Sequence, residues 1–586
     1  MSERKKYPLS PEVKVELNRF RSEVQAIEAG HGDMDDFKKF RLENGVYGIR
    51  FQDRKHMIRI KIMYGIMTPD QLDAVAEVAE KYTPLKLGHV TTRQAIQIHN
   101  IDRLDVADAL TILNESGLTT REACGNTVRN VTACPYAGVS ATEPFDYLPY
   151  ADALSWHFLR HPVCQNLPRK FKIAFEGCPG EDHARVGIHD LGFIAQTRQV
   201  NGKTEKGFKV YVGGGLGGQP FEAQLLEEFM PVDLIFATTE AVLRIFDRHG
   251  NRKNRNLARI KFVVKNWGIE EFRKIFIAER KAVLATRSGK DKWEVHRPEE
   301  KEPQFAPFKE LPGVVPPGFE AWKKTNVKAQ KQKGFHTVFV RCLLGDMTVA
   351  QMRDVAQLGR QYAGGSLRTT ITQNMVLNWV SDKALVEVYK GLMKTGLAEA
   401  GAELLPDITR CPGADTCQLA ITHSRGLAAH LTPVFNNGLG SDPELKDVSI
   451  KISGCPNSCG QHHIADIGFY GNSRTIDGKQ VPHYRMLLGG GTASGAAWFG
   501  QAVMQIPARN VKPAVEKLLQ SYKSDKQRSE KFGDFVKRVG HDKVKALLNE
   551  YTIVPTYAEN PDLYKDLGDE EGKLFKVEVG KGECAS

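Results

Sequence analysis

The chain repeats itself once, and this internal repeat limits the folds open to it more than any other feature. MTPDQLDAVAEVAEKY from Met67 aligns without a gap with MTVAQMRDVAQLGRQY from Met347, an offset of 280 residues. Further on, Cys134-Pro135 matches Cys411-Pro412, and Gly177-Cys178-Pro179 matches Gly454-Cys455-Pro456, both at an offset of 277. Two copies predict a compact body with pseudo-twofold symmetry, because a solenoid needs at least three repeats.

Each copy has two parts, and both mix helices with strands. The first part reads strand, helix, strand, helix: IRIKIMYG, a helix from Thr68, GHVTTRQAIQIHNI, and a helix near DVADALTILNESG in the first copy. The second part carries a strand into the Gly-Cys-Pro loop, a short strand at LGF or IGF, and a strand that ends at a glycine triplet, Gly213 to Gly215 or Gly489 to Gly491. The predicted fold class is α/β, built from duplicated α+β units.

A chain of 586 residues is too long for one hydrophobic core, so we expect several domains. The Pro-rich, charged stretch from Arg297 to Gly318 indicates a linker between the copies. The residues from Gly568 onward, with Cys584 near the end, are predicted to be a mobile tail. The predicted boundaries are 1–122 for an N-terminal segment and the first opening half, 123–296 for the second part of the first copy, 297–330 for the linker, 331–404 for the second opening half, 405–567 for the second part of the second copy, and 568–586 for the tail.

Four cysteines in the second copy indicate an iron-sulfur cluster. Cys411 and Cys417 lie in TRCPGADTC, and Cys455 and Cys459 lie in ISGCPNSCG. Two short loops can bring four thiolates to one cubane cluster. We expect the four-residue separation in the second loop to put both sulfurs on one face of a helical turn, and Gly454 and Gly460 to let the backbone approach the inorganic core.

The alternatives fit these cysteines less well. Zinc knuckles space their ligands by two to four residues, and the first loop leaves five residues between its cysteines. Ten cysteines among 586 residues are too few for a disulfide framework, and the start of the chain lacks the apolar segment of an export signal. No apolar run is long enough to span a bilayer. We therefore expect a reducing, cytoplasmic location.

The two copies differ where their chemistry should lie. The first copy has Ser140 and Asp182 where the second has Cys417 and Cys459, so we expect it to hold no cluster. It carries cations instead: Arg59, Arg129, Lys170 and Lys172 stand where the second copy has Phe339, Pro406, Asp447 and Ser449. Lys170 and Lys172 are two residues apart on an expected strand and point to the same face. A Lys-x-Lys pair is often a solvated strand face, but beside a redox cluster it predicts a pocket for an oxyanion.

Taken together, the motifs resemble one known family. The paired cysteine loops, VTTRQAIQIH, RNVTACP, LPRKFK and the two glycine triplets are similar to those of the siroheme-containing nitrite and sulfite reductases, over about Tyr47 to Thr552. The resemblance is to the ferredoxin-dependent assimilatory type, nearest to the sulfite reductase hemoprotein. It implies three domains around siroheme, the paired opening halves of both copies forming one of them.

The resemblance also implies roles for individual residues. Cys411, Cys417, Cys455 and Cys459 would bind a [4Fe-4S] cluster, and Cys459 would bridge it to the siroheme iron. The anion pocket would be Arg59, Arg129, Lys170 and Lys172, with arginines binding the oxyanion and lysines delivering protons. The residues expected around the many carboxylates of siroheme are Thr91, Thr92, Arg93, Gln94, Gln97, Arg169, Arg252, Lys253, Asn254, Arg259 and Lys261.

The resemblance leaves the substrate open between two anions. Lys172 in LPRKFK favours sulfite, because nitrite reductases of plant type tend to have asparagine there and a dianion gains more from a fourth cation than a monoanion does. His89 stands where many relatives have arginine, and nitrite remains the alternative. Some relatives place a tyrosine and a cysteine near the pocket, at positions similar to Tyr47 and Cys124 here, which suggests a covalent thioether between these two residues.

The electron donor is expected to be a separate protein. No dinucleotide-binding fingerprint occurs in the required strand-to-helix context. A formal net charge of +11 and a pI near 9.0 favour docking of an acidic donor such as ferredoxin, with a flavoprotein reductase as the alternative. A basic chain could instead bind nucleic acid, but no nucleic-acid module is recognisable. An iron-sulfur electron-transfer protein that reduces no anion is the remaining alternative.

Overall fold

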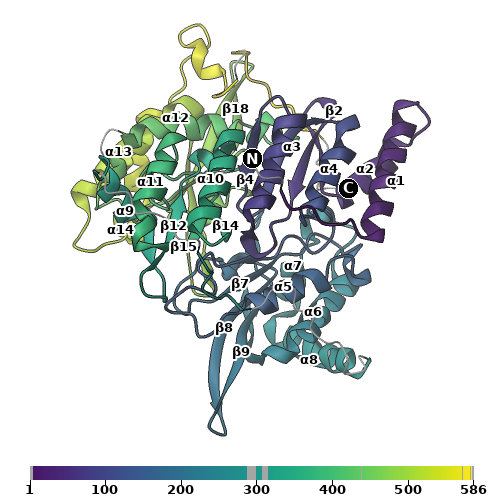
Figure 1. Ribbon diagram of the computed structural model, residues 1–586. Helices are drawn as coiled ribbons and strands as arrows, with labels where there is room; N and C mark the ends of the chain where they lie inside the picture. Colours follow the sequence, from purple (N-terminus) through teal and green to yellow (C-terminus); the bar gives the residue numbers. More distant parts are fainter. Residues whose placement is uncertain are drawn as a thin grey trace.

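Five-stranded sheets form the framework of the protein. The computed structural model describes residues 4–286, 299–305, 314–436, 439–569, 572–580 and 583. Within these residues there are four sheets of five strands each and one two-stranded ribbon (Figure 1). The three largest hydrophobic clusters correspond to three domains. The expected α/β, internally duplicated, three-domain fold is confirmed.

The opening parts of both copies build one domain. The first copy supplies β1 (Val46–Ile49), β2 (Gln52–Ile60), β3 (Ile66–Met67), α3 (Pro69–Tyr82), β4 (Leu87–Val90), β5 (Ile96–Asp102) and α4 (Val106–Glu115). The second supplies α9 (Phe319–Asn326), β11 (Val327–Ala329), β12 (Phe335–Val340), β13 (Asp346–Thr348), α10 (Val349–Tyr362), β14 (Leu367–Thr369), β15 (Met375–Ser381) and α11 (Leu385–Lys394). Two further helices, α1 (Pro11–Glu28) and α2 (Met34–Glu43), precede this pair of units.

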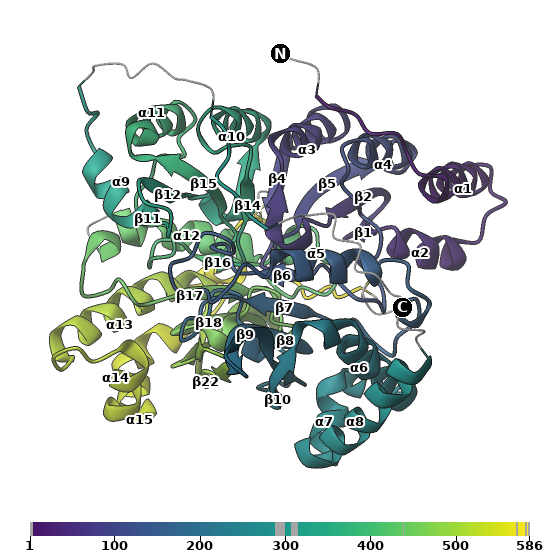
Figure 2. The same cartoon turned by 60° about the horizontal axis from the view of Figure 1, so that its bottom comes forward.

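The two opening sheets exchange their last strands. Their orders are β1-β2-β5-β4-β13 and β11-β12-β15-β14-β3. Met347 of β13 is paired with Gly88 of β4, and Met67 of β3 with Leu367 of β14. Figure 2 shows β4 and β14 near the middle of this domain, with α3, α4, α10 and α11 over one side. The exchange is the pseudo-twofold relation that the repeat predicts, and both copies contribute to a single core.

Both copies start their first long helix in the same way. Thr68 accepts a hydrogen bond from the backbone N–H of Gln71, whose side chain accepts in return from the N–H of Thr68. Thr348 and Gln351 repeat this capping box at the start of α10. The T-x-x-Q spacing satisfies two N–H groups that lack partners within the helix. A local sequence motif therefore sets where each helix starts.

The second parts of the two copies form the other two domains. The first contains β6 (Thr132–Ala133), α5 (Leu148–His157), β7 (Ile173–Glu176), β8 (Leu191–Val200), β9 (Lys203–Val212), β10 (Gln224–Pro231), α6 (Ile235–His249), α7 (Ile260–Trp267) and α8 (Ile269–Thr286). The second contains β16 (Thr409–Arg410), α12 (Ser424–Asn436), β17 (Ile450–Ser453), β18 (Ile467–Ile476), β19 (Lys479–Leu488), β20 (Gly491–Ala493), β21 (Ala496–Trp498), β22 (Gln501–Pro507), α13 (Val511–Asp525), α14 (Phe532–Val539) and α15 (His541–Leu548).

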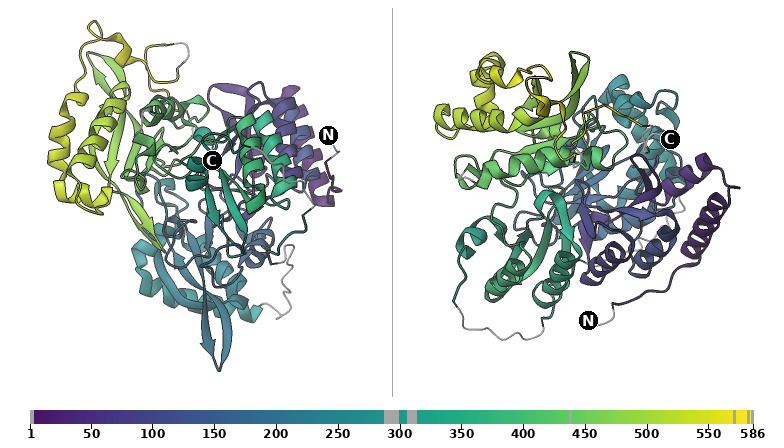
Figure 3. Two further views of the ribbon diagram at one scale, coloured as in Figure 1. Left: turned by 60° about the vertical axis from the view of Figure 1, so that its left-hand side comes forward. Right: turned by 90° about the horizontal axis from the view of Figure 1, so that it is seen from above.

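Parallel strands bring each pair of Cys-Pro loops together. β6, β7 and β8 are parallel, as are β16, β17 and β18. Cys134 follows β6 and Cys178 follows β7, while Cys411 and Cys455 take the same places after β16 and β17. The carboxyl ends of neighbouring parallel strands lie at one sheet edge, so cysteines distant in sequence meet there. At the other end of the first of these domains, the long β8–β9 hairpin projects from the body (Figure 3).

Several elements differ from the sequence-based expectation. Residues 88–101 form two strands, because the chain turns at Gln94, where φ is 54°. The strands at LGF and IGF are ten residues long rather than short. The expected linker at 297–330 is too long, since residues 319–329 fold as α9 and β11, where Trp322 is fully buried. No described helix has the length and apolar character needed to cross a bilayer.

The C-terminal segment packs against the body instead of forming a mobile tail. The backbone N–H of Gly580 donates to the carbonyl of Gln418, which follows Cys417. Glu583 accepts from both terminal nitrogens of Arg41, at 2.6 and 2.9 Å, and from the N–H of Gly48. A largely buried arginine therefore holds the end of the chain beside α2. Cys584 lies outside the described residues.

Candidate functional site

A cationic cavity of about 490 Å³ lies between the three domains. All three contribute residues to it, and its described lining contains seven arginines and three lysines but no carboxylate: Arg59, Arg93, Arg129, Arg169, Arg255, Arg259, Arg410, Lys170, Lys172 and Lys261. Like charges this close repel one another, and an anionic occupant relieves the repulsion. The cavity is therefore built for a ligand that carries several negative charges.

The four predicted substrate cations all line this cavity. Arg59 donates to the hydroxyl of Tyr47 at 2.6 Å and stacks over its ring at 4.6 Å. In the amide orientation that satisfies both residues, the oxygen of Gln97 accepts from Arg59 Nε and Nη2. Arg129 donates to the carbonyls of Ala123 and Gly125. Both guanidinium groups are thus held in place before any ligand binds.

Lys170 and Lys172 line the cavity while the residues between and after them enter the core. Phe171 and Ile173 are fully buried, so side chains alternate between the two sides as predicted. Burial keeps the pKa of Lys172 well below its ordinary value, and the cations Arg259, Arg93 and Lys170 lower it further. A lysine whose pKa is lowered in this way can give up its proton to a bound anion.

The turn between β4 and β5 connects the opening domain to residues 455–461, which we call the cluster loop. Thr91, Thr92, Arg93 and Gln97 line the cavity. The Thr92 hydroxyl donates to the carbonyl of Cys459 at 2.8 Å. Arg93 donates to His189 Nε2 and to the carbonyl of Ile173, and its Nε has no hydrogen-bond partner among the described residues. This turn places polar groups from one domain against both of the others.

The ten lining cations named above form what we call the cationic wall. Asp190 contacts two of these residues, Arg259 and Lys172, and was not found by sequence reasoning. Its carboxylate accepts from Arg259 Nε and Nη2 at 2.9 and 2.7 Å, and from the backbone N–H of Lys172 at 2.8 Å. Asp466, its counterpart in the second copy, accepts from the backbone N–H of Ser449 in the same way. The repeat itself was the signal, because the aspartate stands in both HDLGF and ADIGF.

Lys261 holds the loop after the first glycine triplet. Its ammonium donates to the carbonyls of Leu216, Gly215 and Gln219, while burial and then Arg259 lower its pKa to about 7.

A second polar network lies under Cys411. Gln373 donates to His89 Nε2 at 3.1 Å, and His89 Nδ1 donates to Asp346 at 2.8 Å. Arg410 donates to the other oxygen of Asp346 at 2.7 Å. Burial and then the charge of Arg410 lower the pKa of His89, which lines the cavity. This network was also missed, because it joins residues from both copies.

Some predicted cofactor residues do not line the cavity. Gln94 is fully buried and donates to the carbonyls of Ala133 and Thr369. Arg252 pairs with Asp247 on the surface, and Lys253 is exposed there. Asn254 caps the short turn that follows it. The next two residues, Arg255 and Asn256, line the cavity instead, and Arg169, Arg259 and Lys261 line it as expected.

Tyr47 and Cys124 belong to one small hydrophobic cluster. Cys124 is fully buried, and the Tyr47 hydroxyl donates to the carbonyl of its neighbour Ala123 at 3.1 Å. The same hydroxyl accepts from Arg59. Their placement beside the pocket agrees with the cross-link hypothesis, which stays a prediction.

The four cysteines predicted to bind the cluster lie along one wall of the cavity and behind it. Cys411 and Cys459 line it, and Cys459 is the exposed one, whereas Cys411 and Cys455 are buried. Burial raises the pKa of the Cys455 thiol, and the thiols of Cys459, Cys411 and Cys417 raise it further. Among the described residues, however, no three of them gather within 4.8 Å. A single zinc ion would hold sulfurs about 3.8 Å apart, so the spacing suits a larger inorganic core.

One local expectation for these loops is corrected, and the approach of the two glycines to the cluster stays a prediction. The Cys455–Cys459 loop consists of turns rather than a helical turn, because Ser458 has a φ of 57°. Gly454 and Gly460 are needed for packing within the chain. A Cβ on Gly454 would lie 2.7 Å from the carbonyl oxygen of Thr422, and one on Gly460 would lie 2.0 Å from that of Ile452.

Four cysteines beside a cationic cavity are typical of a redox enzyme that uses an iron-sulfur cluster to reduce an anion. The family description "Nitrite and sulphite reductase 4Fe-4S domain" matches residues 124–283 and 402–555, and "Nitrite/Sulfite reductase ferredoxin-like half domain" matches 49–116 and 328–395. The chain belongs to the nitrite and sulfite reductase family.

Some relatives that align over most of the chain are named nitrite reductases, and others are named sulfite reductases. An assimilatory ferredoxin-dependent nitrite reductase of Haloferax mediterranei is 28% identical, covering 84% of this chain and 83% of that protein. A sulfite reductase [ferredoxin] 1 of Mycolicibacterium paratuberculosis is also 28% identical, covering 85% and 84%. The structure of the Mycobacterium tuberculosis NirA protein superposes with a TM-score of 0.76 at 25% identity, covering 92% of this chain and 98% of that one.

Family membership makes this chain a siroheme-dependent oxidoreductase with a [4Fe-4S] cluster, and its residues fit both groups. The cationic lining suits a macrocycle with many carboxylates. Three lining residues also have a buried polar atom without a partner among the described residues, namely Arg93 Nε, Arg410 Nε and Ser458 Oγ. The exposed Cys459 lies where the cluster loop meets the cavity.

Proposed function

We propose that this protein reduces sulfite to sulfide in a six-electron reaction. In this proposal Cys411, Cys417, Cys455 and Cys459 hold the [4Fe-4S] cluster, and Cys459 bridges it to the siroheme iron. The cluster and siroheme would store electrons and pass them to the bound anion. The supporting observation is that the exposed Cys459 lines the same cavity as the cations.

The substrate choice rests on Lys172. Three cations, Arg59, Arg129 and Lys170, would suffice to hold a monoanion, and Lys172 adds a fourth beside them. Its lowered pKa suits it to donate protons as oxygens leave as water. The two arginines, fixed by Tyr47 and by backbone carbonyls, would bind and orient the oxyanion.

Reduction of nitrite to ammonia is the second candidate. Relatives at the same 28% identity are named as nitrite reductases and as sulfite reductases. The same cations could bind either anion, so only turnover separates the two.

We further propose ferredoxin as the electron donor. The relatives from Haloferax mediterranei and Synechococcus elongatus carry ferredoxin in their names. The net charge of +11 favours an acidic partner through charge complementarity. A flavoprotein reductase is the alternative. A cytoplasmic location would keep the cluster thiols reduced.

Anaerobic turnover with reduced methyl viologen tests the substrate assignment. We expect a higher kcat/KM for sulfite than for nitrite, with sulfide and ammonium quantified as products. Lys172→Asn should lower kcat/KM for sulfite about 10- to 100-fold and that for nitrite less, because a hydrogen bond to a charged group contributes about 1.5–3 kcal/mol. Lys265→Asn, which removes an exposed cation outside the cavity, is the matched control.

Three results would count against this assignment. A preference for nitrite in the unmodified enzyme would transfer the function to ammonia formation. Equal losses for both anions in Lys172→Asn would show that this lysine does not set specificity. Absence of turnover in protein that retains its siroheme absorption would leave an electron-transfer role.

A further inference from the structure

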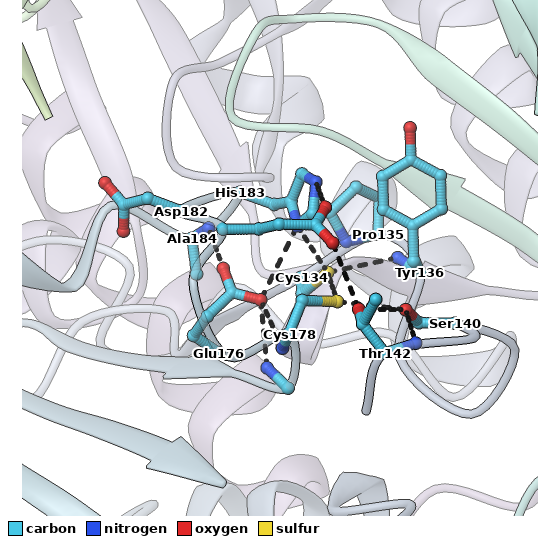
Figure 4. A network of polar contacts seen from close by, with 12 residues as sticks. Cys134, Pro135, Tyr136, Ser140, Thr142, Glu176, Cys178, Asp182, His183 and Ala184 are labelled. Atoms are coloured by element: carbon cyan, nitrogen blue, oxygen red, sulfur yellow. Dashed lines mark hydrogen bonds and ion pairs between the residues drawn. The ribbon is translucent and has the colours of Figure 1, made fainter. Parts of the chain in front are cut away.

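The first copy contains a compact group of metal-ligand side chains away from the cluster. Cys134 follows β6, Cys178 follows β7, Glu176 ends β7, and His183 lies five residues after Cys178. Their ligand atoms all lie within 4.8 Å of one another. Figure 4 shows the two sulfurs, the imidazole and the carboxylate converging on one point. The two cysteines are the repeat counterparts of Cys411 and Cys455, while His183 replaces Gly460.

The distances within this group match a tetrahedral zinc site. Cys134 Sγ lies 3.9 Å from Cys178 Sγ and 3.3 Å from His183 Nδ1, and His183 Nδ1 lies 3.6 Å from Glu176 Oε1. Bonds of about 2.3 Å to sulfur and about 2.1 Å to nitrogen or oxygen put tetrahedral ligands about 3.8 Å apart for two sulfurs and about 3.4 to 3.6 Å apart for the other pairs. No large movement is needed to enclose an ion.

The surroundings are those of a zinc site as well. His183 Nε2 donates to Glu181 at 3.0 Å, the carboxylate–histidine arrangement that fixes the tautomer of a metal ligand. Cys134 Sγ accepts from the N–H of Tyr136. The carboxylate of Glu176 is held by the N–H groups of Cys178 and Ala184. Only His183, at 23% side-chain exposure, reaches solvent, and it provides a route of entry.

We propose that Cys134, Cys178, His183 and Glu176 bind one structural zinc ion. The site is closed by four protein ligands, which is the pattern of structural rather than catalytic zinc. It occupies the sheet edge that carries the iron-sulfur cluster in the other copy.

The ion would fix the loop after Cys178. This loop continues through Arg185, whose side chain contacts Gln461 of the cluster loop, to His189, the partner of Arg93. Zinc would thus stabilise the connection between the cationic wall and the cluster without taking part in the reduction.

Metal analysis of the intact holoenzyme tests this site. After an EDTA wash, we expect one zinc per chain in addition to the iron. X-ray absorption at the zinc edge should show two sulfur ligands at about 2.3 Å and two nitrogen or oxygen ligands at about 2.0 to 2.1 Å. Cys178→Ser and His183→Ala should reduce zinc from one per chain to near zero with unchanged iron and siroheme absorption. Cys164→Ser, which alters another buried thiol of the same domain, should keep the zinc.

Other outcomes overturn the proposal. One is protein that contains no zinc and takes up none from an equimolar solution. Another is zinc bound by nitrogen and oxygen alone, which would place it at the separate group of His157, His161 and Glu240. A disulfide between Cys134 and Cys178, or iron at this position, would also exclude the zinc site. If the variants do not accumulate as folded protein, the X-ray absorption spectrum at the zinc edge of the unmodified enzyme decides whether the ligands are two sulfurs and two nitrogen or oxygen atoms.

Discussion

Asp190 carries the negative charge that pairs with Arg259 in the cationic wall, and Asp190→Asn tests how strongly the position of Arg259 depends on that charge. The carboxylate is fully buried, Arg259 is 8% exposed, and their two hydrogen bonds measure 2.9 and 2.7 Å. Asparagine keeps the shape but removes the charge and presents one donor to a guanidinium that can only donate. No carboxylate among the described residues lines the cavity, so none there could compensate.

The expected cost follows from the geometry. Removing one partner of a buried ion pair costs about 3–5 kcal/mol, because the remaining charge is left without compensation. At about 1.36 kcal/mol per factor of ten, the protection of β8 amides against hydrogen exchange should fall roughly 150- to 5000-fold in the cofactor-free protein. Hydrogen exchange measured by mass spectrometry is the suitable assay, because it reports on each domain separately. Unfolding of a three-domain chain is not a single two-state transition.

The repeat supplies a matched control. Asp466 occupies the same place in the second copy, but its carboxylate accepts from the backbone and hydroxyl of Ser449 rather than from an arginine. Asp466→Asn should therefore cost only about 1–2 kcal/mol in β18, the scale of ordinary hydrogen bonds. Equal costs at the two positions, or a smaller one at Asp190, would refute the view that this aspartate holds the cationic wall.

Two further predictions concern the cavity. The pKa of Lys261 is about 7 in the folded protein and near 10.5 in an unfolded chain, so the unfolded state binds more protons between these values. The stability of the cofactor-free protein, measured by thermal unfolding, should rise with pH across that window. Both Lys261→Met and siroheme loading should make this rise smaller. Identical pH profiles for the cofactor-free protein, the variant and the siroheme-loaded protein would contradict this. If Tyr47 and Cys124 are cross-linked, proteolysis should release one joined peptide of both segments, and recovery of two separate unmodified peptides would remove the hypothesis.

The two copies show how one scaffold can be used in two ways. In each, a pair of parallel strands delivers two cysteines to the same sheet edge. Four thiolates in the second copy suit a cubane cluster, whereas two thiolates, an imidazole and a carboxylate in the first suit a smaller ion. The cations that line the cavity come largely from the first copy. In the function proposed above, the first copy would therefore bind the anions and the second would hold the cluster.

The sequence by itself was enough to predict the duplication, the starts of α3 and α10, the cysteine loops and the pocket cations Arg59, Arg129, Lys170 and Lys172. These features are local patterns or repeats, and each can be recognised without knowing which distant segment it meets. The tertiary structure alone decided the exchange of β3 and β13, the role of Asp190, the approach of His183 to Cys134, and the docking of Glu583 on Arg41. It also decided that Arg255 rather than Arg252 lines the cavity. Such contacts depend on the paths of loops between domains, and no periodicity or spacing along the chain encodes them.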